Sequence, residues 1–278
     1  MTIHGFPNDG IVVRTRFGNY ASRFVIADNY IGTDSEGQTA VPNGRWGVSI
    51  IGGFADLVSN VISGNGRSAV SAVESWWLRI VGNQIGVAAG DSSRPIPNGA
   101  SGIYIAGASQ TEIFANTIAN SAHFGVAISR GADSVAIRGN SIFANGGLGI
   151  DYGLDSVTFN DDPDRPENLP PYPVILSARW DESLKATRIE GTVERWGLAG
   201  GVVELFRDTT ADPSGFGEAR ELIATIDVEG SLEEDMQHFS VLVERDLRGE
   251  VVTSTWSRHH GSGNYPRTSE ISAAVPVD

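Results

Sequence analysis

The chain has 278 residues, 40% of them hydrophobic, and this length is sufficient for two buried cores. Its formal net charge of −14 argues against nucleic acid as a partner, because phosphate binding depends on clustered Lys and Arg. It has no cysteine, which excludes disulfides and Cys-ligated zinc, and no apolar run near the ~18 residues of a membrane span, so membrane insertion is not expected. At the start, residues 1–7 lack the basic and apolar stretches of a signal peptide.

One phrase, hydrophobic-x-x-Asn-x-Ile, recurs along the first half of the chain. It is centred on Asn29, Asn60, Asn83, Asn116 and Asn140. The steps between these asparagines are alternately long and short, and the long steps contain insertions at 32–44 and 86–99 that both end in Pro-Asn-Gly. Two coils therefore form one larger repeat.

A second phrase follows each copy of the first and consists of a small residue leading a short apolar-alternating run. The leading residues are Gly10, Gly47, Ala69, Gly102, Gly125 and Gly149. Period-two alternation predicts strands with one face inward. Coils of ~23 residues with strands between tight turns are typical of a parallel β-helix. We therefore predict an all-β fold that begins with a right-handed parallel β-helix of about six coils over 1–165.

Stacking of the coils predicts which residues meet. Three interior rows are expected: Leu57, Ile80, Ile113 and Ile137; Ile62, Ile85, Ile118 and Ile142; and Val48, Val70, Ile103, Val126 and Ile150. The repeated asparagines predict a structural hydrogen-bonded ladder. One outward row, Asp56, Arg79 and Glu112, indicates charge pairing that maintains register.

A second outward row is expected along a flat exterior and contains Ser49, Ser71, Tyr104, Ala127 and Asp151. Trp76 and Trp77 lie at a neighbouring turn. Flat polar surfaces with aromatic side chains suit sugar rings, so Trp76, Trp77 and Tyr104 are candidate ligand-binding residues. Trp46 aligns with Phe124 and Leu148, which favours a buried turn position.

The repeat ends after Gly149 in an acidic, Pro-containing segment. Its carboxylates are Asp151, Asp155, Asp161, Asp162 and Asp164. Such a segment can block the open strand edges of a β-helix. Clustered carboxylates also suit a hard cation, so calcium is a possible cofactor here, although the spacing does not match a helix-loop-helix calcium loop.

A Pro-rich linker at 166–173 precedes a region with a different sequence pattern. Residues 174–278 contain about seven alternating segments separated by turn signals, which favours an Ig-like antiparallel β-sandwich. His259 and His260 are adjacent and point to opposite faces of a strand, so they are not expected to bind one metal.

These features resemble the bacterial right-handed parallel β-helix repeat proteins, pectin-lyase-like solenoids followed by an Ig-like module. The segments that carry the resemblance are 29–34, 60–65, 147–151, 212–218 and 268–270. The family often has cysteines where this chain has Ala211 and Ala274. The resemblance implies a secreted or cell-surface location and a carbohydrate-related or adhesive role, and it transfers no catalytic residue.

Three functions follow as alternatives. The favoured one is a non-catalytic protein with a carbohydrate-binding or adhesive role, whose partner is a polysaccharide or glycan surface. The second is a polysaccharide lyase or glycoside hydrolase, for which the best catalytic candidates are Glu74, Asp133 and Arg138. The third is a stiff structural stalk. Any chemistry is expected at positions that the repeat leaves free, chiefly the two insertions, the Trp pair and the acidic segment. The sequence indicates no oligomeric state.

Overall fold

The computed structural model describes residues 1–15, 23–129, 131–166, 169–194, 200–229, 235–259 and 266–278. It contains two compact units, Met1–Ser156 and Val157–Asp278. The regular elements in the described ranges are all strands, so the predicted all-β fold is confirmed. Within those ranges there is no helix long and apolar enough to cross a membrane.

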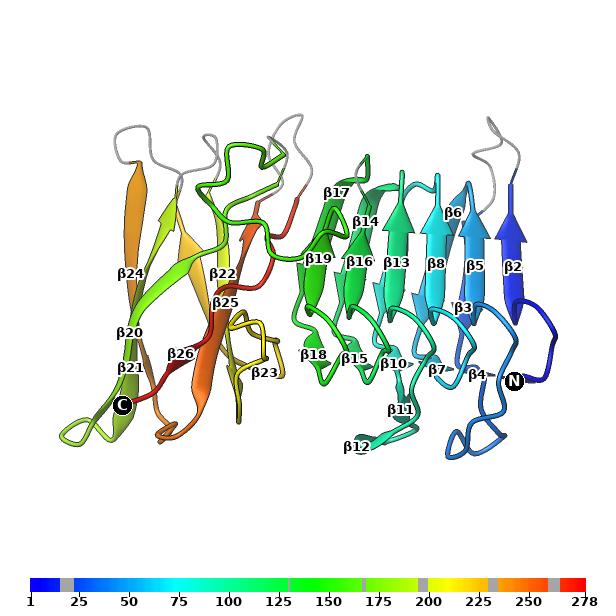
Figure 1. Ribbon diagram of the computed structural model, residues 1–278, viewed down its shortest axis with the longest axis horizontal. Helices are drawn as coiled ribbons and strands as arrows, with labels where there is room; N and C mark the ends of the chain where they lie inside the picture. Colours follow the sequence, from blue (N-terminus) through cyan, green and yellow to red (C-terminus); the bar gives the residue numbers. More distant parts are fainter. Residues whose placement is uncertain (16–22, 130, 167–168, 195–199, 230–234, 260–265) are drawn as a thin grey trace. The chain divides into compact units, whose positions relative to one another are not determined.

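The first unit is a parallel β-helix of about six coils built from three parallel sheets, as the repeat predicts (Figure 1). Sheet A contains β1 (Thr2–Ile3), β4 (Tyr30–Ile31), β7 (Val61–Ile62), β10 (Gln84–Ile85), β15 (Thr117–Ala119) and β18 (Ser141–Phe143). Sheet B contains β2 (Ile11–Arg14), β5 (Val48–Ile51), β8 (Val70–Val73), β13 (Ile103–Ala106), β16 (Val126–Ile128) and β19 (Ile150–Tyr152). Sheet C contains β3 (Arg23–Ala27), β6 (Phe54–Val58), β9 (Arg79–Val81), β14 (Ser109–Phe114) and β17 (Asp133–Arg138).

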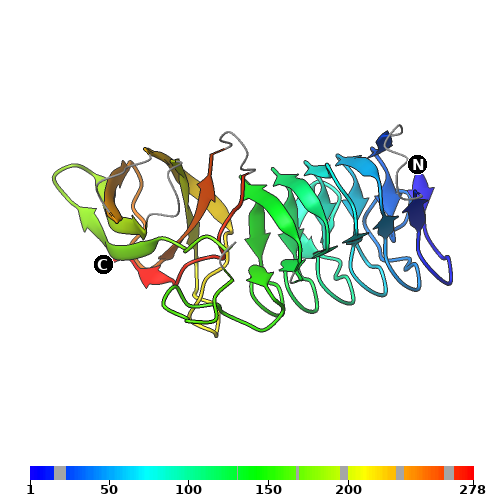
Figure 2. The same ribbon diagram turned by 90° about the horizontal axis from the view of Figure 1, so that it is seen from above.

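Each of the three predicted interior rows lies on one sheet. Leu57, Ile80, Ile113 and Ile137 pair across sheet C; Ile62, Ile85, Ile118 and Ile142 pair across sheet A; and Val48, Val70, Ile103, Val126 and Ile150 pair across sheet B. All of them are buried. Equivalent strands stack along the axis of the first unit (Figure 2). Because they stack in register, each row forms a continuous apolar column.

The predicted asparagine ladder is also present. The side-chain Nδ2 donates to Oδ1 of the next asparagine over 3.0 Å from Asn29 to Asn60 and over 2.9 Å at the three later steps, through Asn83 and Asn116 to Asn140. Each Oδ1 also accepts the backbone N–H of the preceding asparagine, as from Asn60 to Asn83 at 2.9 Å. The ladder therefore satisfies buried backbone groups and has a structural role.

A second ladder, which the sequence did not predict, is formed by the asparagines of the Asn-Gly pairs. These lie at the turn between sheet A and sheet B, whereas the first ladder lies between sheet C and sheet A. Asn43 donates from Nδ2 to Oδ1 of Asn65 at 3.0 Å, and Asn65 donates to Asn98 at 3.1 Å. The column continues with Ser121, whose backbone N–H donates to Oδ1 of Asn145 at 3.1 Å. The recurrence of Asn-Gly was the available signal, but the insertions obscure its period.

The outward row of sheet B is aligned as predicted, but most of it is not an open exterior. Ser49 pairs with Ser71, Ser71 with Tyr104, and Tyr104 with Ala127 and so with Asp151. The two serines, the alanine and Asp151 are buried and only Tyr104 is partly exposed. The expectation of a flat polar exterior there is wrong, because four of the five side chains are buried.

The second unit contains two antiparallel sheets around one core, which confirms the predicted antiparallel region. One sheet is β20 (Val174–Asp181), β21 (Ala186–Glu194) and β24 (Met236–Val243); the other is β23 (Glu221–Val228), β22 (Gly201–Asp208), β25 (Val251–Arg258) and β26 (Val275–Pro276). Ile189 and Phe239 from the first sheet share the core with Val203, Leu205 and Trp256 from the second. His260 lies outside the described residues.

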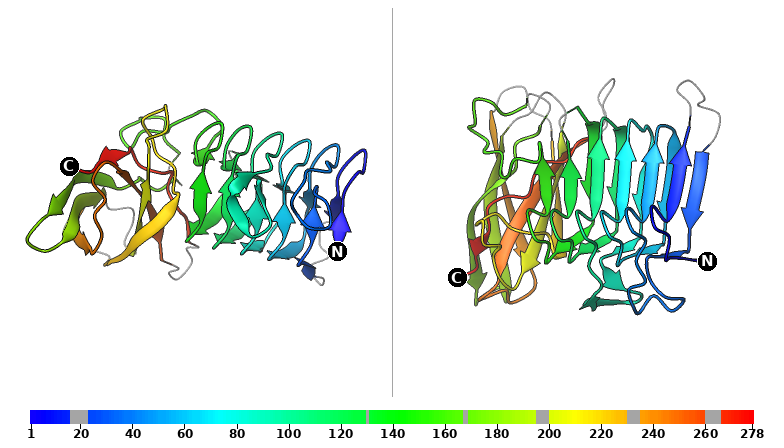
Figure 3. Two further views of the ribbon diagram at one scale, coloured as in Figure 1. Left: turned by 90° about the horizontal axis from the view of Figure 1, so that it is seen from below. Right: turned by 45° about the vertical axis from the view of Figure 1, so that its right-hand side comes forward.

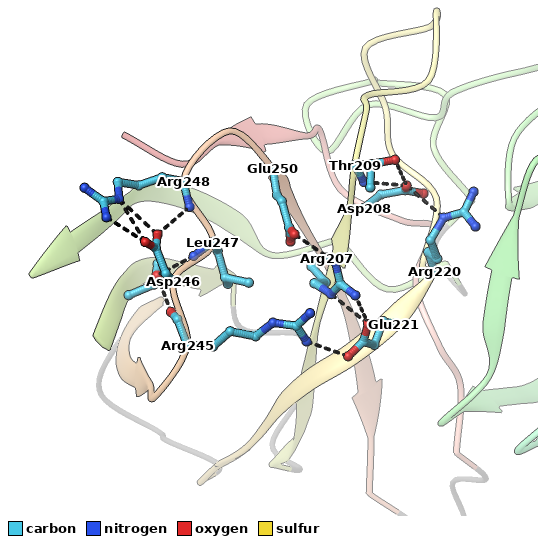
Figure 4. A network of polar contacts seen from close by, with 11 residues as sticks. Arg207, Asp208, Thr209, Arg220, Glu221, Arg245, Asp246, Leu247, Arg248 and Glu250 are labelled. Atoms are coloured by element: carbon cyan, nitrogen blue, oxygen red, sulfur yellow. Dashed lines mark hydrogen bonds and ion pairs between the residues drawn. The ribbon is translucent and has the colours of Figure 1, made fainter. Parts of the chain in front are cut away.

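A network of ion pairs connects strands of this second unit (Figure 4). Arg207 contacts Glu221 and donates from Nη1 to Oε1 of Glu250 at 2.8 Å, while Arg245 donates to the other oxygen of Glu221 at 2.8 Å. The hydrogen bonds from Arg207 and then Arg245 lower the pKa of Glu221. The network has balanced charges, so it indicates a structural role rather than a binding site.

Candidate functional site

The two insertions leave the solenoid at equivalent points, directly after sheet A in coils two and four. The first follows β4, and the second follows β10 and includes a hairpin of β11 (Val87–Ala88) and β12 (Asp91–Pro95). Their neighbouring loops extend from the same side of the first unit (Figure 3). The insertions are therefore positioned to meet across the intervening coil.

They do meet, through backbone and side-chain hydrogen bonds. Ala89 donates its N–H to the carbonyl of Gly37 at 2.9 Å, and Gln38 donates from Nε2 to the carbonyl of Ala89 at 3.0 Å. Arg94 donates from Nη1 to Oε1 of Gln38 at 3.0 Å. Gly37 has φ +69°, and a Cβ there would lie 2.6 Å from Cβ of Ala89 and 2.9 Å from the ring of Tyr30. Glycine thus permits close contact between the insertions.

A pocket of 310 Å³ lies beside this bridge, where sheet C turns into sheet A. It is lined by Asp28, Asn29, Tyr30, Ser59, Asn60, Val61, Gly82, Gln84, Ala89 and Gly90. The volume is near the lower end of the range for small-molecule sites, about 300–1,000 Å³. We call it the insertion pocket, because Ala89 and Gly90 belong to the second insertion. Only these two lining residues belong to a segment in which the sequence predicts chemistry; the others belong to the repeating coils.

One wall of the insertion pocket is a stack of left-handed turn residues. Asp28, Ser59 and Gly82 occupy equivalent positions in successive coils, since Asp28 N–H donates to Val58 and Ser59 N–H to Val81. Their φ angles are 56°, 55° and 65°. The side chain shrinks from a carboxylate to a hydroxyl to hydrogen along the stack. The only heavy atom close to a Cβ at Gly82 would be Ser59 Oγ at 3.7 Å, so this glycine leaves open space.

The remaining wall supplies polar groups and an aromatic ring. Tyr30, Val61 and Gln84 are paired in register on sheet A. Gln84 accepts the N–H of Gly90 at Oε1 over 2.8 Å, and its amide nitrogen makes no hydrogen bond with the described residues. The exposed Asp28 carboxylate likewise has no hydrogen bond or ion pair there. The insertion pocket is therefore lined by donors, acceptors and an aromatic residue.

The predicted binding residues lie elsewhere on the solenoid. Trp77 is 52% exposed and packs edge to face on Phe54, with ring centroids 6.5 Å apart, while Trp76 is partly buried. Tyr104 is on sheet B, so the structure does not gather it with the Trp pair on one strand face. Trp46 is partly buried and stacks below the guanidinium of Arg45 at 4.2 Å.

The outward face of sheet C carries the predicted charge ladder. Arg79 lies 3.9 Å from Asp56 and 3.5 Å from Glu112. Arg23, which the sequence did not suggest, extends the ladder through a 2.5 Å contact with Asp56. Phe114 is also exposed on this face. Because the charges on this face are paired, it has no excess of either sign. The exposed ring adds an apolar area to it.

The three catalytic candidates are not collected at one point. Trp76 bridges Ser109, and Ser109 pairs with Asp133, so Glu74 and Asp133 belong to coils two levels apart, roughly 10 Å along the axis. Arg138 ends the strand that Asp133 begins, about 16 Å away. The cation that would complete a lyase site is thus separated from the acids.

The acidic segment is divided between the two units. Asp151 is buried and its carboxylate accepts backbone N–H groups from Leu154 at 2.8 Å and Ser156 at 3.2 Å; desolvation by burial raises its pKa. Asp155 also lies in the first unit and Asp161, Asp162 and Asp164 in the second. No group of three His, Cys, Asp or Glu that could hold a metal occurs in the part of the chain that the structure describes. Calcium stays a prediction.

The fold and these surfaces define the class as a parallel β-helix repeat protein with a C-terminal antiparallel module. The chain matches the family model described as "Periplasmic copper-binding protein (NosD)" over residues 13–162. The match covers more than half of the chain, which therefore belongs to the NosD family. That description places the family outside the cytoplasm. None of the curated proteins compared with the chain matches it.

Two solved structures show distant likeness. One is the full-length tailspike protein 2 from the Escherichia coli O157:H7 bacteriophage CAB120, with 11% identity and a TM-score of 0.34, covering 98% of this chain and 57% of that one. The other is the enzymatically active domain of tailspike protein 2 of bacteriophage CBA120, with 9% identity and a TM-score of 0.28, covering 98% and 60%. The chain thus spans less than two thirds of either protein.

Proposed function

We propose that this NosD-family protein binds glycans without cleaving them, at a secreted or cell-surface location. The insertion pocket is the observation that carries the proposal. Sugars present hydroxyl groups that donate and accept hydrogen bonds, and apolar C–H faces that pack on aromatic rings. Asp28, Ser59 and Gln84 supply the polar partners and Tyr30 supplies the ring. The site is built from stacked turns, which keeps these groups fixed.

The distribution of carboxylates supports binding over catalysis. Glycoside hydrolysis requires two carboxyl groups facing one bond. The insertion pocket contains a single carboxylate, Asp28, and the acids proposed for catalysis, Glu74 and Asp133, are not among its lining residues. A lyase or hydrolase acting on the outer face is the alternative that the experiment below also tests.

Copper binding, which the family description names, has little support from the residues described. Copper sites use thiolate, thioether or imidazole ligands. The chain has no Cys and only two Met, and these, Met1 and Met236, lie in different units. The described histidines do not take part in any group of three potential ligands. These residues do not fit a copper centre, so the proposal uses no metal.

A glycan array, followed by gel-retention assays on a polysaccharide panel, tests the proposed function. The discriminating variant is Gly82→Asn, because Asn tolerates a left-handed turn and its side chain would fill the insertion pocket. Ala115→Asn is the matched control, since Ala115 has φ 53° and is absent from the lining.

Binding that is lost in Gly82→Asn and kept in Ala115→Asn is the expected result. Absence of binding to every glycan would overturn the proposal and leave the stalk alternative. Release of reducing ends or unsaturated products from any polysaccharide would show the enzyme alternative instead.

A further inference from the structure

We infer that the insertion pocket selects uncharged or cationic sugar residues and rejects uronic acids. This inference rests on the proposed function and names its ligand class. It starts from the ionisable groups of the lining. Asp28 is the only Asp or Glu in the lining, which contains no Arg, Lys or His. A uronate in the insertion pocket would therefore meet a carboxylate, and no lining residue would supply a compensating cation.

Asp28 is positioned so that its carboxylate can interact with a bound ligand. Its backbone is held in the left-handed turn by the N–H donated to Val58 at 3.1 Å, and its carboxylate is not engaged by any described residue. A free carboxylate forms strong, charge-assisted hydrogen bonds with hydroxyl donors. The same group repels a second carboxylate. Hydroxylated neutral rings therefore gain an acceptor where uronates meet a like charge.

The lining residues add no opposite charge to offset this effect. The Met1 ammonium donates to the backbone carbonyl of Asp28 at 3.4 Å, but it is exposed to solvent, which screens its charge, and Met1 is not a lining residue. Ser59, one coil from Asp28, contributes a hydroxyl, and Gly82, one coil further, contributes open space. A sugar ring that lies over Ser59 is therefore adjacent to Asp28, about 5 Å along the axis. Arg94, from the second insertion, donates to Gln38 and is not among the lining residues. Lyase chemistry acts on uronates with a neutralising Arg or Ca²⁺, so the inference also separates the insertion pocket from the lyase alternative.

Saturation-transfer NMR and calorimetry on the full chain test the inference. The probes are methyl glucopyranoside, N-acetylglucosamine, glucosamine, glucuronate and galacturonate at low salt. Neutral sugars should bind roughly tenfold more tightly than uronates, with glucosamine at least as tight as the neutral sugars. In Asp28→Asn this preference should shrink to within about twofold, because the amide carries no charge while tolerating the same turn.

The outcomes separate the two claims. Equal binding of glucuronate and its neutral counterpart, or an unchanged ratio in Asp28→Asn, overturns the inference but leaves glycan binding intact. Binding of none of the probes by the wild-type chain, together with a negative glycan array, overturns both. Ala115→Asn should reproduce the wild-type ratio, and a changed ratio there would show that the selectivity arises outside the insertion pocket.

Discussion

Asn60 donates a hydrogen bond from its side-chain Nδ2 to Oδ1 of Asn83, 2.9 Å away in the next coil, and both side chains are buried. Asn83 also accepts the backbone N–H of Asn60 at 2.9 Å and donates to the carbonyl of Leu57 at 2.9 Å. The ladder thus joins each turn to the adjoining coils. It also forms the support beneath the insertion pocket, whose lining includes Asn29 and Asn60.

Replacing Asn83 by Ala should strongly destabilise the solenoid. The buried Asn60 N–H would lose its acceptor, and each buried unsatisfied group costs about 1–3 kcal/mol, so the free energy of unfolding should fall by at least ~2 kcal/mol. Chemical denaturation followed by circular dichroism measures the change. Asn29→Ala is the control, because Asn29 is at the end of the ladder and partly exposed, and about 1 kcal/mol is expected there. If the two variants lost the same free energy of unfolding, the stabilisation would not depend on the number of ladder hydrogen bonds removed, and the prediction would be wrong.

Contact between the insertions should depend on glycine at position 37. Gly37→Ala places a methyl group 2.6 Å from Cβ of Ala89, whereas Gly90→Ala, with a similar φ of +72°, meets nothing within 4 Å. Both variants incur the left-handed cost of about 1 kcal/mol. Only Gly37→Ala should accelerate hydrogen exchange at the Ala89 amide, which donates to Gly37. Similar exchange rates in both variants would show that the bridge tolerates the added methyl.

Trp77 should contribute to binding of long glycans rather than to folding. It is 52% exposed, so Trp77→Ala should change the free energy of unfolding by less than about 1 kcal/mol. On polysaccharide gels the variant should be retained less, because an exposed ring stacks on sugar faces, with little change for monosaccharides. Val25→Ala, an exposed apolar change on sheet C, should leave retention unaltered. Unchanged retention in Trp77→Ala would remove this ring from the binding surface.

The ion-pair network of the second unit should make stability depend on pH. Arg207 and Arg245 lower the pKa of Glu221 below the unfolded value of about 4.3, so its stabilisation is present above that pH. It is lost as the pH falls through the folded pKa. Glu221→Gln should therefore cost up to about 1 kcal/mol at pH 7, since the side chain is 44% exposed, and less at lower pH. Thermal unfolding at pH 7 and pH 3 gives the comparison; a pH-independent difference would contradict the assignment.

The solenoid was predictable because its constraints repeat. The rows through Ile80, Ile85 and Ile103 could be aligned from the sequence, since stacked coils require the same apolar residue at equivalent positions. The asparagine ladder was predictable for the same reason. The burial of Ser49 and Ser71 was not, because a small outward side chain is buried or exposed according to the size of its neighbours.

The insertion pocket could not be predicted from the sequence alone. The repeat showed that the two insertions are irregular segments. Their contact through Gly37 and Ala89 and the open space at Gly82 do not recur along the chain, so the repeat could not predict them. Residues distant in sequence, Asp28 and Gly90, line one site. The sequence by itself determined the coils, the interior rows and the antiparallel region that follows. Tertiary structure decided where a ligand could bind, because that depends on how non-repeating loops pack against the repeating turns.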